Sequence, residues 1–432
     1  MCQYCRSAFS RRAFLGRSAL AGGGLLMAGA ATPLLAQEKS AKPAQQKKPA
    51  ASAQKTSALN KAAKPSAPAS TEKSATKSEN SSGIKTRGYA AKDESGKLVP
   101  WEFERRAVGD DDILINIKYA SICHSDIHQE KGDWGKQPYP QVPGHEIVGI
   151  VAEVGKNVTK FKVGDRAGVG CMVGSCLVCE ACKQGLEQHC ERQETLWTYG
   201  SVDKREPSGI TQGGYSNRIV VPAHFAVHIP EALRLEEAAP LLCAGITTYS
   251  PLMKYGVKEG SKVGVAGIGG LGHMAVKLAA SKGAEVYAFT TSPKKVDAIR
   301  SLGAKEVVVV SSLDRLRPFK GALDYMIATI PEQFDVAAYA ACVKPFGFFT
   351  VVGMAKGFKL DISAIAFANS RVNFNTSLIG GMKETQELVN YCAERNITPQ
   401  VQMIAADKIN EAWENVQAKK ALFRYVIDAA TF

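Results

Sequence analysis

The sequence lacks several features that would assign it to a class at once. No internal repeat is visible, and no stretch offers the ~20 strongly apolar residues of a membrane-spanning helix, since the best candidate, residues 19–35, contains three consecutive glycines. Hydrophobic residues make up 45% and charged residues 22% of the chain, as in an ordinary globular protein. With 432 residues, the chain has room for two domains with buried cores.

A concentrated positive charge is also missing from most of the chain. The formal net charge is +13, but residues 1–36 hold four Arg and no acid, and residues 37–83 hold nine Lys and three Glu. Residues 84–432 hold 41 basic and 38 acidic residues. Because this larger part is nearly balanced, we expect no nucleic-acid partner.

Acidic residues are absent from the first 36 positions, whose pattern is typical of a targeting segment. Arg11 and Arg12 precede a weakly apolar run, rich in Gly and Ala, that ends in small residues near Ala36. The arginine pair resembles the bacterial twin-arginine export signal. This resemblance predicts a signal peptide over 1–36, the twin-arginine export machinery as a partner and a periplasmic location, or a cytoplasmic one if the signal is not used. It predicts no stable membrane anchor, because the glycines weaken the apolar run.

Large apolar side chains are nearly absent from residues 37–83, which consist mainly of Ala, Lys, Pro and Ser. Such a segment cannot offset the entropy of ordering by burying apolar surface. We interpret it as a disordered linker.

Globular patterning starts near residue 84. Short β-rich runs such as 112–120 and 146–155 alternate with Gly and Pro turns and predict a barrel-like unit up to about residue 234. From 235 to 375, strands alternate with helices, beginning with a strand–turn–helix–strand unit over 262–290. Beyond 375 this rhythm stops, and the sequence predicts a surface helix over 380–397 and a closing strand over 422–429.

Glycines fill the first turn of that unit, in the pattern G-x-G-G-x-G. They are Gly267, Gly269, Gly270 and Gly272. Between a strand and a helix, glycine lets the backbone turn tightly and approach a pyrophosphate at the helix N-terminus. The pattern predicts a dinucleotide-binding site.

An acid is missing where an NAD-binding protein usually carries one, at the end of the second strand. Thr290, Thr291 and Ser292 occupy those positions, and Lys295 follows them. An acid would repel a 2′-phosphate, whereas hydroxyl groups and an ammonium group would bind it. We therefore predict NADP(H) rather than NAD(H) as the cofactor.

Four cysteines lie within fifteen residues, in the pattern C-x-x-C-x-x-C-x7-C. They are Cys176, Cys179, Cys182 and Cys190. Disulfides within adjacent C-x-x-C pairs would be strained, and a thioredoxin-like motif should open a helix after a strand. Tandem pairs with a fourth thiol on one loop suit a tetrahedral zinc ion, and four thiolates leave no place for the neighbouring His189. We predict a closed structural zinc site.

A second set of metal-binding side chains is dispersed along the sequence. Cys123, His145 and Cys243 offer two thiols and an imidazole, which would leave the fourth position of a catalytic zinc ion open. Taken singly, however, a buried Cys is usually a small apolar residue and a His a satisfied core residue. The residues alone leave this set undecided.

Eight motifs in a fixed order carry a family resemblance over about residues 84–432. They are "CHSDIH", "YPQVPGHEIVG", "GVGCMVGSC", the four-cysteine loop, "LLCAGITTY", "GIGGLG", "TTSPKK" and "GGMKETQEL". Together they resemble the zinc-dependent medium-chain alcohol dehydrogenases, above all the cinnamyl alcohol dehydrogenase branch. The resemblance implies an α/β fold in which a doubly wound Rossmann domain (235–375) is inserted in a GroES-like β-barrel catalytic domain (84–234), to which residues 376–432 return. We also expect a homodimer.

The resemblance also implies roles for single residues. Cys123, His145 and Cys243 match the catalytic zinc ligands, and the four-cysteine loop matches the structural zinc site, which gives two zinc ions per chain. The other matches are Glu146 beside the metal, Ser125 and His128 in a proton relay, Asp126 as the partner of the histidine ligand, and Trp134 in the substrate pocket.

The implied activity is the reversible, NADPH-dependent reduction of aldehydes to primary alcohols, with a small aldehyde or alcohol as substrate. One alternative is a polyol or formaldehyde dehydrogenase of the same superfamily, which the missing acid at Thr290 disfavours. Another is a non-catalytic periplasmic protein that binds zinc or a dinucleotide, which the intact set of predicted ligands and relay residues disfavours. Members of the family usually lack an export signal. Because the twin-arginine pathway carries folded proteins with their cofactors already inserted, we expect an exported protein to load its zinc in the reducing cytoplasm.

Overall fold

The computed structural model describes residues 83–357, 359, 368 and 370–432. The predicted signal peptide and linker therefore lie outside the described residues. No helix in the described ranges has both the length and the apolar character needed to cross a membrane.

A seven-stranded sheet forms the core of the first unit. Its order is β16-β17-β3-β4-β5-β9, and β8 also pairs with β3. The strands are β3 (Asp112–Ser121), β4 (Ile147–Val154), β5 (Arg166–Val169), β8 (Arg218–Pro222), β9 (Ala226–His228), β16 (Val401–Ile404) and β17 (Arg424–Asp428). Alternate residues of β3, such as Ile113 and Ile115, are fully buried against Ile147 and Val151 of β4. This period of two is what the sequence of β3 predicts for a strand with one face in the core.

Two two-stranded sheets and a short helix are further parts of this unit. They are β1 (Ile84–Ala91) with β2 (Leu98–Arg105), β6 (Met172–Gly174) with β7 (Leu196–Trp197), and α1 (His124–Glu130). Helix α1 follows β3 directly, which places its first turn at the end of that strand.

Six parallel strands form the second sheet, in the order β12-β11-β10-β13-β14-β15. They are β10 (Lys262–Ala266), β11 (Glu285–Thr290), β12 (Glu306–Val309), β13 (Leu323–Ala328), β14 (Val343–Val351) and β15 (Asn373–Thr376). In chain order this is 3-2-1-4-5-6, the doubly wound arrangement of dinucleotide-binding domains. The predicted fold class is confirmed, whereas the polar edge strand β15 (NFNT) was not predicted, because its sequence carries no alternating apolar pattern.

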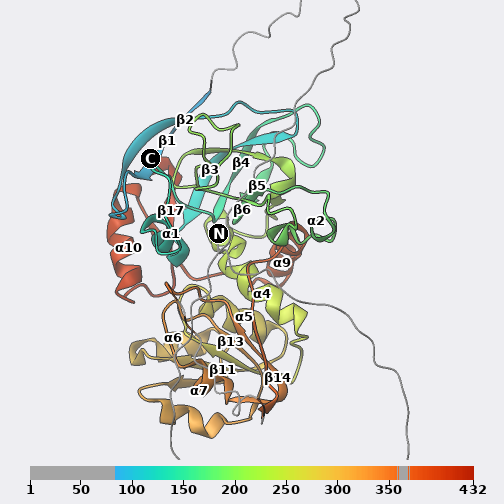
Figure 1. Ribbon diagram of the computed structural model, residues 1–432, viewed down its shortest axis with the longest axis vertical. Coiled ribbons are helices and arrows are strands. Elements are labelled where there is room, and N and C mark those ends of the chain that lie inside the picture. The colour runs from blue at the N-terminus through green and yellow to red at the C-terminus, as the bar shows by residue number, and fades with distance from the viewer. Residues whose placement is uncertain (1–82, 358, 360–367, 369) are drawn as a thin grey trace, which may run out of the picture. The chain divides into compact units, whose positions relative to one another are not determined.

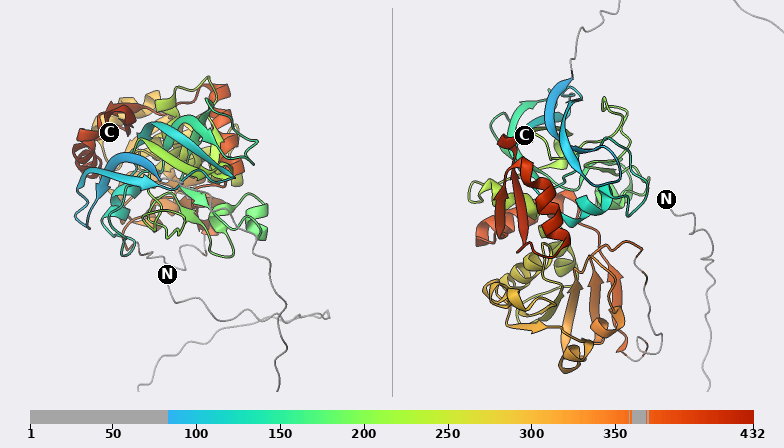
Figure 2. Two further views of the ribbon diagram at one scale, coloured as in Figure 1. Left: turned by 90° about the horizontal axis from the view of Figure 1, so that it is seen from above. Right: turned by 90° about the vertical axis from the view of Figure 1, so that its left-hand side faces the viewer.

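Helices cover both faces of this second sheet, as Figures 1 and 2 show. Helix α5 (Gly272–Ser281) packs beside α4 (Ala244–Lys254), and both contribute to the largest buried cluster. Helix α7 (Val336–Ala340) belongs to the cluster on the other face. A parallel sheet buried on both sides has nearly continuous apolar strands, as in "KVGVA" of β10.

Residues beyond 376 return to the first unit. Strand β17 pairs antiparallel with β3, and α10 (Ile409–Gln417) contacts α1, so the red segments in Figures 1 and 2 lie against the blue-green ones. Helix α9 (Met382–Arg395) corrects one prediction, because it is not merely a surface helix. Leu388, Val389 and Cys392 are fully buried against the core that α4 shares.

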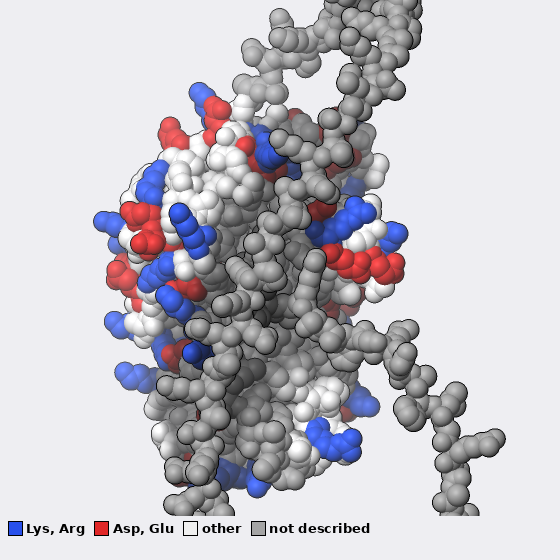
Figure 3. Space-filling view, viewed as in Figure 1, with Lys and Arg blue, Asp and Glu red and all other residues white. Residues whose placement is uncertain are grey.

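Charged side chains of both signs are interspersed on the face shown in Figure 3. Among the described residues of this face, no field of a single sign stands out. The pattern agrees with the nearly balanced charge of residues 84–432.

Candidate active site

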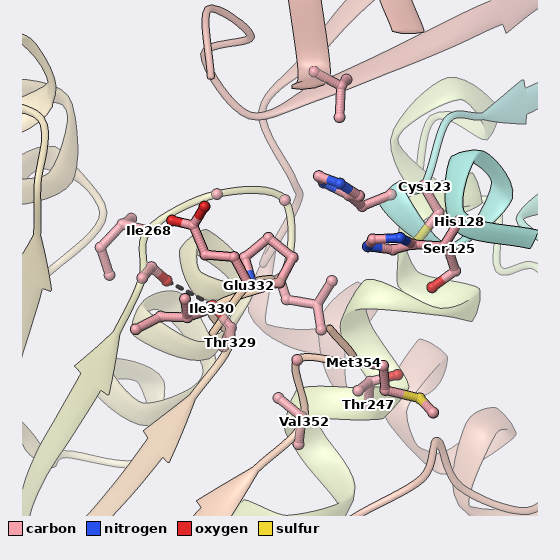
Figure 4. A pocket seen from close by; sticks show the side chains of 18 of the residues that line it. Cys123, Ser125, His128, Thr247, Ile268, Thr329, Ile330, Glu332, Val352 and Met354 are labelled. Atoms are coloured by element: carbon pink, nitrogen blue, oxygen red, sulfur yellow. Dashed lines mark hydrogen bonds between the residues drawn. The ribbon is translucent and has the colours of Figure 1, made fainter. Parts of the chain in front are cut away.

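A cavity of about 1120 Å³ is lined by residues of both units. Ser125 and His128 of α1 lie on one side of it, and Ile268, from the turn after β10, lies across from them (Figure 4). Figure 4 also shows Met354 and Thr247 at the same end of the cavity as Ser125. The cavity thus joins the segments for which we predicted metal binding and dinucleotide binding.

Three distant segments bring the dispersed metal-binding residues together. Cys123 immediately precedes α1, His145 lies just before β4, and Cys243 lies between a 3-10 helix, η3 (Ala239–Leu242), and α4. Their ligand atoms and that of Glu146 all lie within 4.8 Å of one another, and all four residues are buried. Two thiols, an imidazole and a neighbouring carboxylate fit a zinc ion that keeps one position open.

Asp126 orients the histidine of this cluster. Its Oδ1 lies 2.8 Å from Nδ1 of His145 and accepts from the Tyr199 hydroxyl at 2.7 Å. Its Oδ2 accepts from the Tyr215 hydroxyl and from the backbone N–H of Cys123, both at 2.9 Å. Because the carboxylate only accepts, Nδ1 of His145 is the donor, and Nε2 keeps the lone pair that a metal ion needs.

Glu146 is held by a guanidinium group from the far end of the chain. Its Oε1 lies 2.9 Å from Nη2 of Arg424 and accepts from the backbone N–H of Ala244 at 3.2 Å. Burial raises the pKa of Glu146 to about 7, against the opposing charge of Arg424. Nη1 of Arg424 donates to the carbonyl oxygen of Ile122 at 2.7 Å, which fixes the guanidinium beside the cluster.

His128 is supported by an acid that the sequence analysis missed. Helix α1 ends at Glu130, and Gly132, with φ +65°, turns the backbone so that the N–H of Asp133 donates to the carbonyl of His128 at 2.9 Å. Oδ2 of Asp133 then lies 2.8 Å from Nδ1 of His128. Nδ1 is therefore the donor. The side chain of His128 lines the cavity, and its Nε2 is buried without a hydrogen-bond partner among the described residues.

The glycine-rich turn has the geometry that a pyrophosphate requires. Gly267 has φ +86°, which favours glycine, and a Cβ on Gly272 would lie 2.0 Å from the carbonyl oxygen of Gly267. A Cβ on Gly269 would meet no described atom within 4 Å, so this position is open on the side of the cavity that Gly267, Gly269 and Gly270 line. The backbone before α5 can thus approach a bound anion.

All four residues predicted to bind the 2′-phosphate line the cavity, namely Thr290, Thr291, Ser292 and Lys295. Thr290 is buried, and its hydroxyl accepts from the N–H of Ser292 at 3.1 Å, whereas Thr291 is exposed. Nζ of Lys295 donates to the carbonyl oxygens of Ala421 at 2.7 Å and Leu422 at 3.1 Å. One of the three N–H groups of Lys295 therefore remains for a phosphate.

The four-cysteine loop has the dimensions of a tetrahedral thiolate site. The ligand atoms lie within 4.8 Å of one another, and Sγ of Cys176 is 3.8 Å from Sγ of Cys182. Zn–S bonds of about 2.3 Å give S···S edges of about 3.8 Å in a tetrahedron. The N–H groups of Cys179 and Glu191 point at the sulfurs of Cys176 and Cys179, at 3.3 and 3.4 Å. All nine cysteines within the described residues are free, so no disulfide competes there.

This loop docks on the start of α9. Oε2 of Glu187 accepts from the N–H of Met382 at 3.0 Å, and Oε1 lies 2.8 Å from Nε2 of His224. A Cβ on Gly381 would lie 1.6 Å from the carbonyl oxygen of Gly185, so only glycine fits there. The second glycine of "GGMKETQEL" is thus explained by packing against the cysteine loop, whereas the first, Gly380, packs against Ile246 and Glu384.

Two tryptophan side chains border the cavity. Trp134, predicted in the substrate pocket, lines the cavity with its ring centroid 5.4 Å from that of His128. Trp197, which we did not predict, also lines it. Asp133 had a local signal, an acid just after the glycine that ends a short helix, whereas Arg424 and Trp197 had none.

Comparisons with known proteins agree with this arrangement. The sequence model of the alcohol dehydrogenase GroES-like domain matches residues 109–231, and that of the zinc-binding dehydrogenase matches residues 270–394. The chain is 44% identical to the NADP-dependent alcohol dehydrogenase C 1 of Mycolicibacterium smegmatis over 343 residues, which cover 79% of this chain and 97% of the relative. It is 45% identical to a probable mannitol dehydrogenase of Fragaria ananassa over 346 residues, 80% of this chain and 95% of the relative.

Among solved structures, a cinnamyl alcohol dehydrogenase from Sorghum bicolor superposes with a TM-score of 0.77 at 38% identity. The match covers 80% of this chain and 98% of the sorghum chain.

Proposed function

The chain belongs to the medium-chain alcohol dehydrogenase family, and we propose that it interconverts aldehydes and primary alcohols with NADP(H), using one catalytic and one structural zinc ion. The observation that carries the proposal is a shared cavity: the cluster of Cys123, His145 and Cys243 and the glycine-rich turn at 267–272 both border it. A hydride donor bound at the turn would therefore face the metal across one space.

Bound zinc would polarise the substrate oxygen, and bound NADPH would supply the hydride. The protein's own task is to move the proton. Ser125 and His128 border the cavity from the same helix, and Nε2 of His128 has no hydrogen-bond partner among the described residues. In the reduction, Nε2 would release a proton towards the substrate oxygen by way of Ser125, while Asp133 keeps the other ring proton at Nδ1.

The choice of NADP(H) is supported by three hydroxyl side chains and no acid at the end of β11. Thr291 is the best position for a test, because it is exposed and lines the cavity, whereas Thr290 is buried. Thr291→Asp should lower kcat/KM with NADPH by about 10- to 100-fold through repulsion of the 2′-phosphate, with little change for NADH. Thr291→Asn, of similar size but neutral, is the control. A wild-type enzyme that prefers NADH would refute the assignment.

The substrate class is the open part of the proposal. Trp134, Trp197 and Met354 give the cavity an apolar wall, which supports aromatic or extended aliphatic aldehydes. The similarity to a probable mannitol dehydrogenase makes polyols a second candidate. A panel of aromatic aldehydes, aliphatic aldehydes and hexitols, each with NADPH or NADP⁺, separates the two. Turnover of hexitols alone would contradict the aldehyde proposal.

We also propose export by the twin-arginine route, on the sequence of residues 1–36 alone. Replacement of Arg11 and Arg12 by Lys keeps the charge but removes the planar guanidinium groups. The variant should stay in the cytoplasm of its bacterial host, active and zinc-loaded, while the wild type reaches the periplasm shortened near Ala36. Wild-type protein found only at full length in the cytoplasm would contradict this proposal.

A further inference from the structure

Each carboxylate oxygen of Asp133, the acid next to the relay histidine, has its own partner. Oδ2 of Asp133 faces Nδ1 of His128 at 2.8 Å, and Oδ1 lies 2.8 Å from Nζ of Lys356. Asp133 belongs to the first unit, in the turn after α1. Lys356 belongs to the second, in the segment that follows β14, of which Gly353 and Met354 line the cavity. One carboxylate thus connects the relay to the nucleotide-binding unit.

We propose that Lys356 is a positioning residue of the proton relay, which is complete only when the segment after β14 lies against α1. This inference rests on the proposed function of His128 as the relay residue and adds to it a residue from the other unit. Lys356 does not border the cavity, so it acts through Asp133 and not on the substrate.

Geometry gives the first reason. A carboxylate that accepts through only one oxygen can rotate about its Cβ–Cγ bond, whereas a carboxylate bonded through both oxygens is fixed in plane. The ring of His128 would then keep Nδ1 on Asp133 and Nε2 towards the cavity. Asp133 is only 16% exposed in its side chain, so solvent competes little for these bonds.

Charge gives the second reason. Burial tends to raise the pKa of Asp133, but the bonds to Lys356 and His128 outweigh it and lower the pKa, which keeps the group ionised. The negative charge of Asp133 faces the ring of His128 on one side and the ammonium of Lys356 on the other, so the lysine reduces the charge that the ring meets. Among the described residues, His124 of the same helix also stacks on the ring, with the centroids 4.7 Å apart, and its own pKa is lowered by burial and by the nearby His128.

A second ion pair between the units provides a matched control. Nζ of Lys419, in the segment that returns to the first unit, pairs with Glu332, which follows β13 in the second. Lys419 and Lys356 are similarly exposed, at 63% and 68% of the side chain. Only the acceptor of Lys356 also bonds the relay histidine.

The test compares the pH profiles of kcat for aldehyde reduction at saturating NADPH. Lys356→Met should lower the low-pH plateau of kcat, because Asp133 then holds the ring of His128 less firmly. It should also move the midpoint of the profile upward by about half a pH unit, since the charge of Asp133 is no longer compensated. Asp133→Asn should move the midpoint in the opposite direction. Lys356→Arg should restore the wild-type midpoint, and Lys419→Met should leave the midpoint in place even if nucleotide binding changes.

In the double variant Asp133→Asn/Lys356→Met, the plateau of kcat should match that of Asp133→Asn, because the lysine positions the ring of His128 only through the acid. A midpoint that Lys356→Met leaves unmoved, or a further loss of the plateau in the double variant, would overturn the inference. His128→Ala separates this failure from a failure of the relay itself. If His128→Ala slows turnover while Lys356→Met leaves the midpoint in place, the proposed relay stands without Lys356, and if His128→Ala has no effect, both fail.

Discussion

The two cysteine-containing sites differ in the sequence separation of the side chains that form them. The loop site takes four ligands from fifteen consecutive residues, and backbone N–H groups of the same loop point at its sulfurs. The cavity site takes its ligands from positions 123, 145 and 243, and each ligand needs a different element to place it. The local spacing of the cysteines therefore determines the loop site, whereas the topology of the fold determines the cavity site.

This difference predicts different responses to mutation. In the loop site the ligands themselves define the fold of the loop, so the metal and the local structure should be lost together. In the cavity site the supporting network of Asp126, Tyr199 and Tyr215 is as large as the ligand set. A defect there should weaken the metal while the sheets remain folded.

The largest expected effect is the loss of a loop ligand. Cys176→Ser should remove one zinc ion per chain and lower the free energy of unfolding by ~4 kcal/mol or more, because structural zinc contributes directly to folding. Cys171→Ser, at a half-buried thiol outside both ligand sets, is the control and should keep both metals. Metal analysis and denaturant melts measure this difference. A wild-type protein with a single zinc, or with an iron–sulfur chromophore, would refute the two-site assignment.

A smaller effect should follow from the support of the cavity site. Asp126→Asn should weaken the catalytic zinc by about 10- to 100-fold, because the amide no longer fixes Nδ1 of His145 as a donor. Competition with a chelator measures this loss, and the loop zinc should be retained. Tyr199→Phe removes one of the four bonds to Asp126 and should have a weaker effect of the same kind. Equal loss from both metal sites would show that the two sites are not independent.

The smallest effect concerns α1, the helix that carries Ser125 and His128. Burial, with a contribution from Asp126, raises the pKa of Glu130 to about 9, and neither carboxylate oxygen has a hydrogen-bond partner among the described residues. Between its ordinary pKa near 4.5 and about 9, the folded state keeps a proton that the unfolded state has lost. Stability from this group is therefore complete below pH 4.5 and declines as the pH rises through that window.

Glu130→Gln removes this decline, because the amide does not ionise. The variant and the wild type should melt at similar temperatures at pH 5, and the variant should melt a few degrees higher at pH 8. The same offset at both pH values would mean that Glu130 is ionised in the folded protein.

The sequence predicted the parts of this molecule that depend on local pattern. The glycine-rich turn, several strands of both sheets and the cysteine loop follow from spacing and periodicity, whereas the polar edge strand β15 does not. Arg424 beside Glu146, and Lys356 beside Asp133, could not be predicted, because each pair joins segments hundreds of residues apart through the fold. For Cys123, His145 and Cys243, side-chain chemistry alone left a metal-binding role open, and the family resemblance indicated it.

The pairing of β17 with β3 has a consequence for synthesis on the ribosome. Arg424 bonds to the carbonyl of Ile122 across 302 residues and also pairs with Glu146 beside the metal cluster. The first sheet stays incomplete, with residues 119–121 of β3 lacking their partner strand, until the nucleotide-binding unit has emerged and residues 424–428 follow it. A nascent chain can therefore fold its inserted unit early, but its catalytic centre only at the end. Any step that acts on the finished enzyme, export of a folded protein included, would follow that late closure.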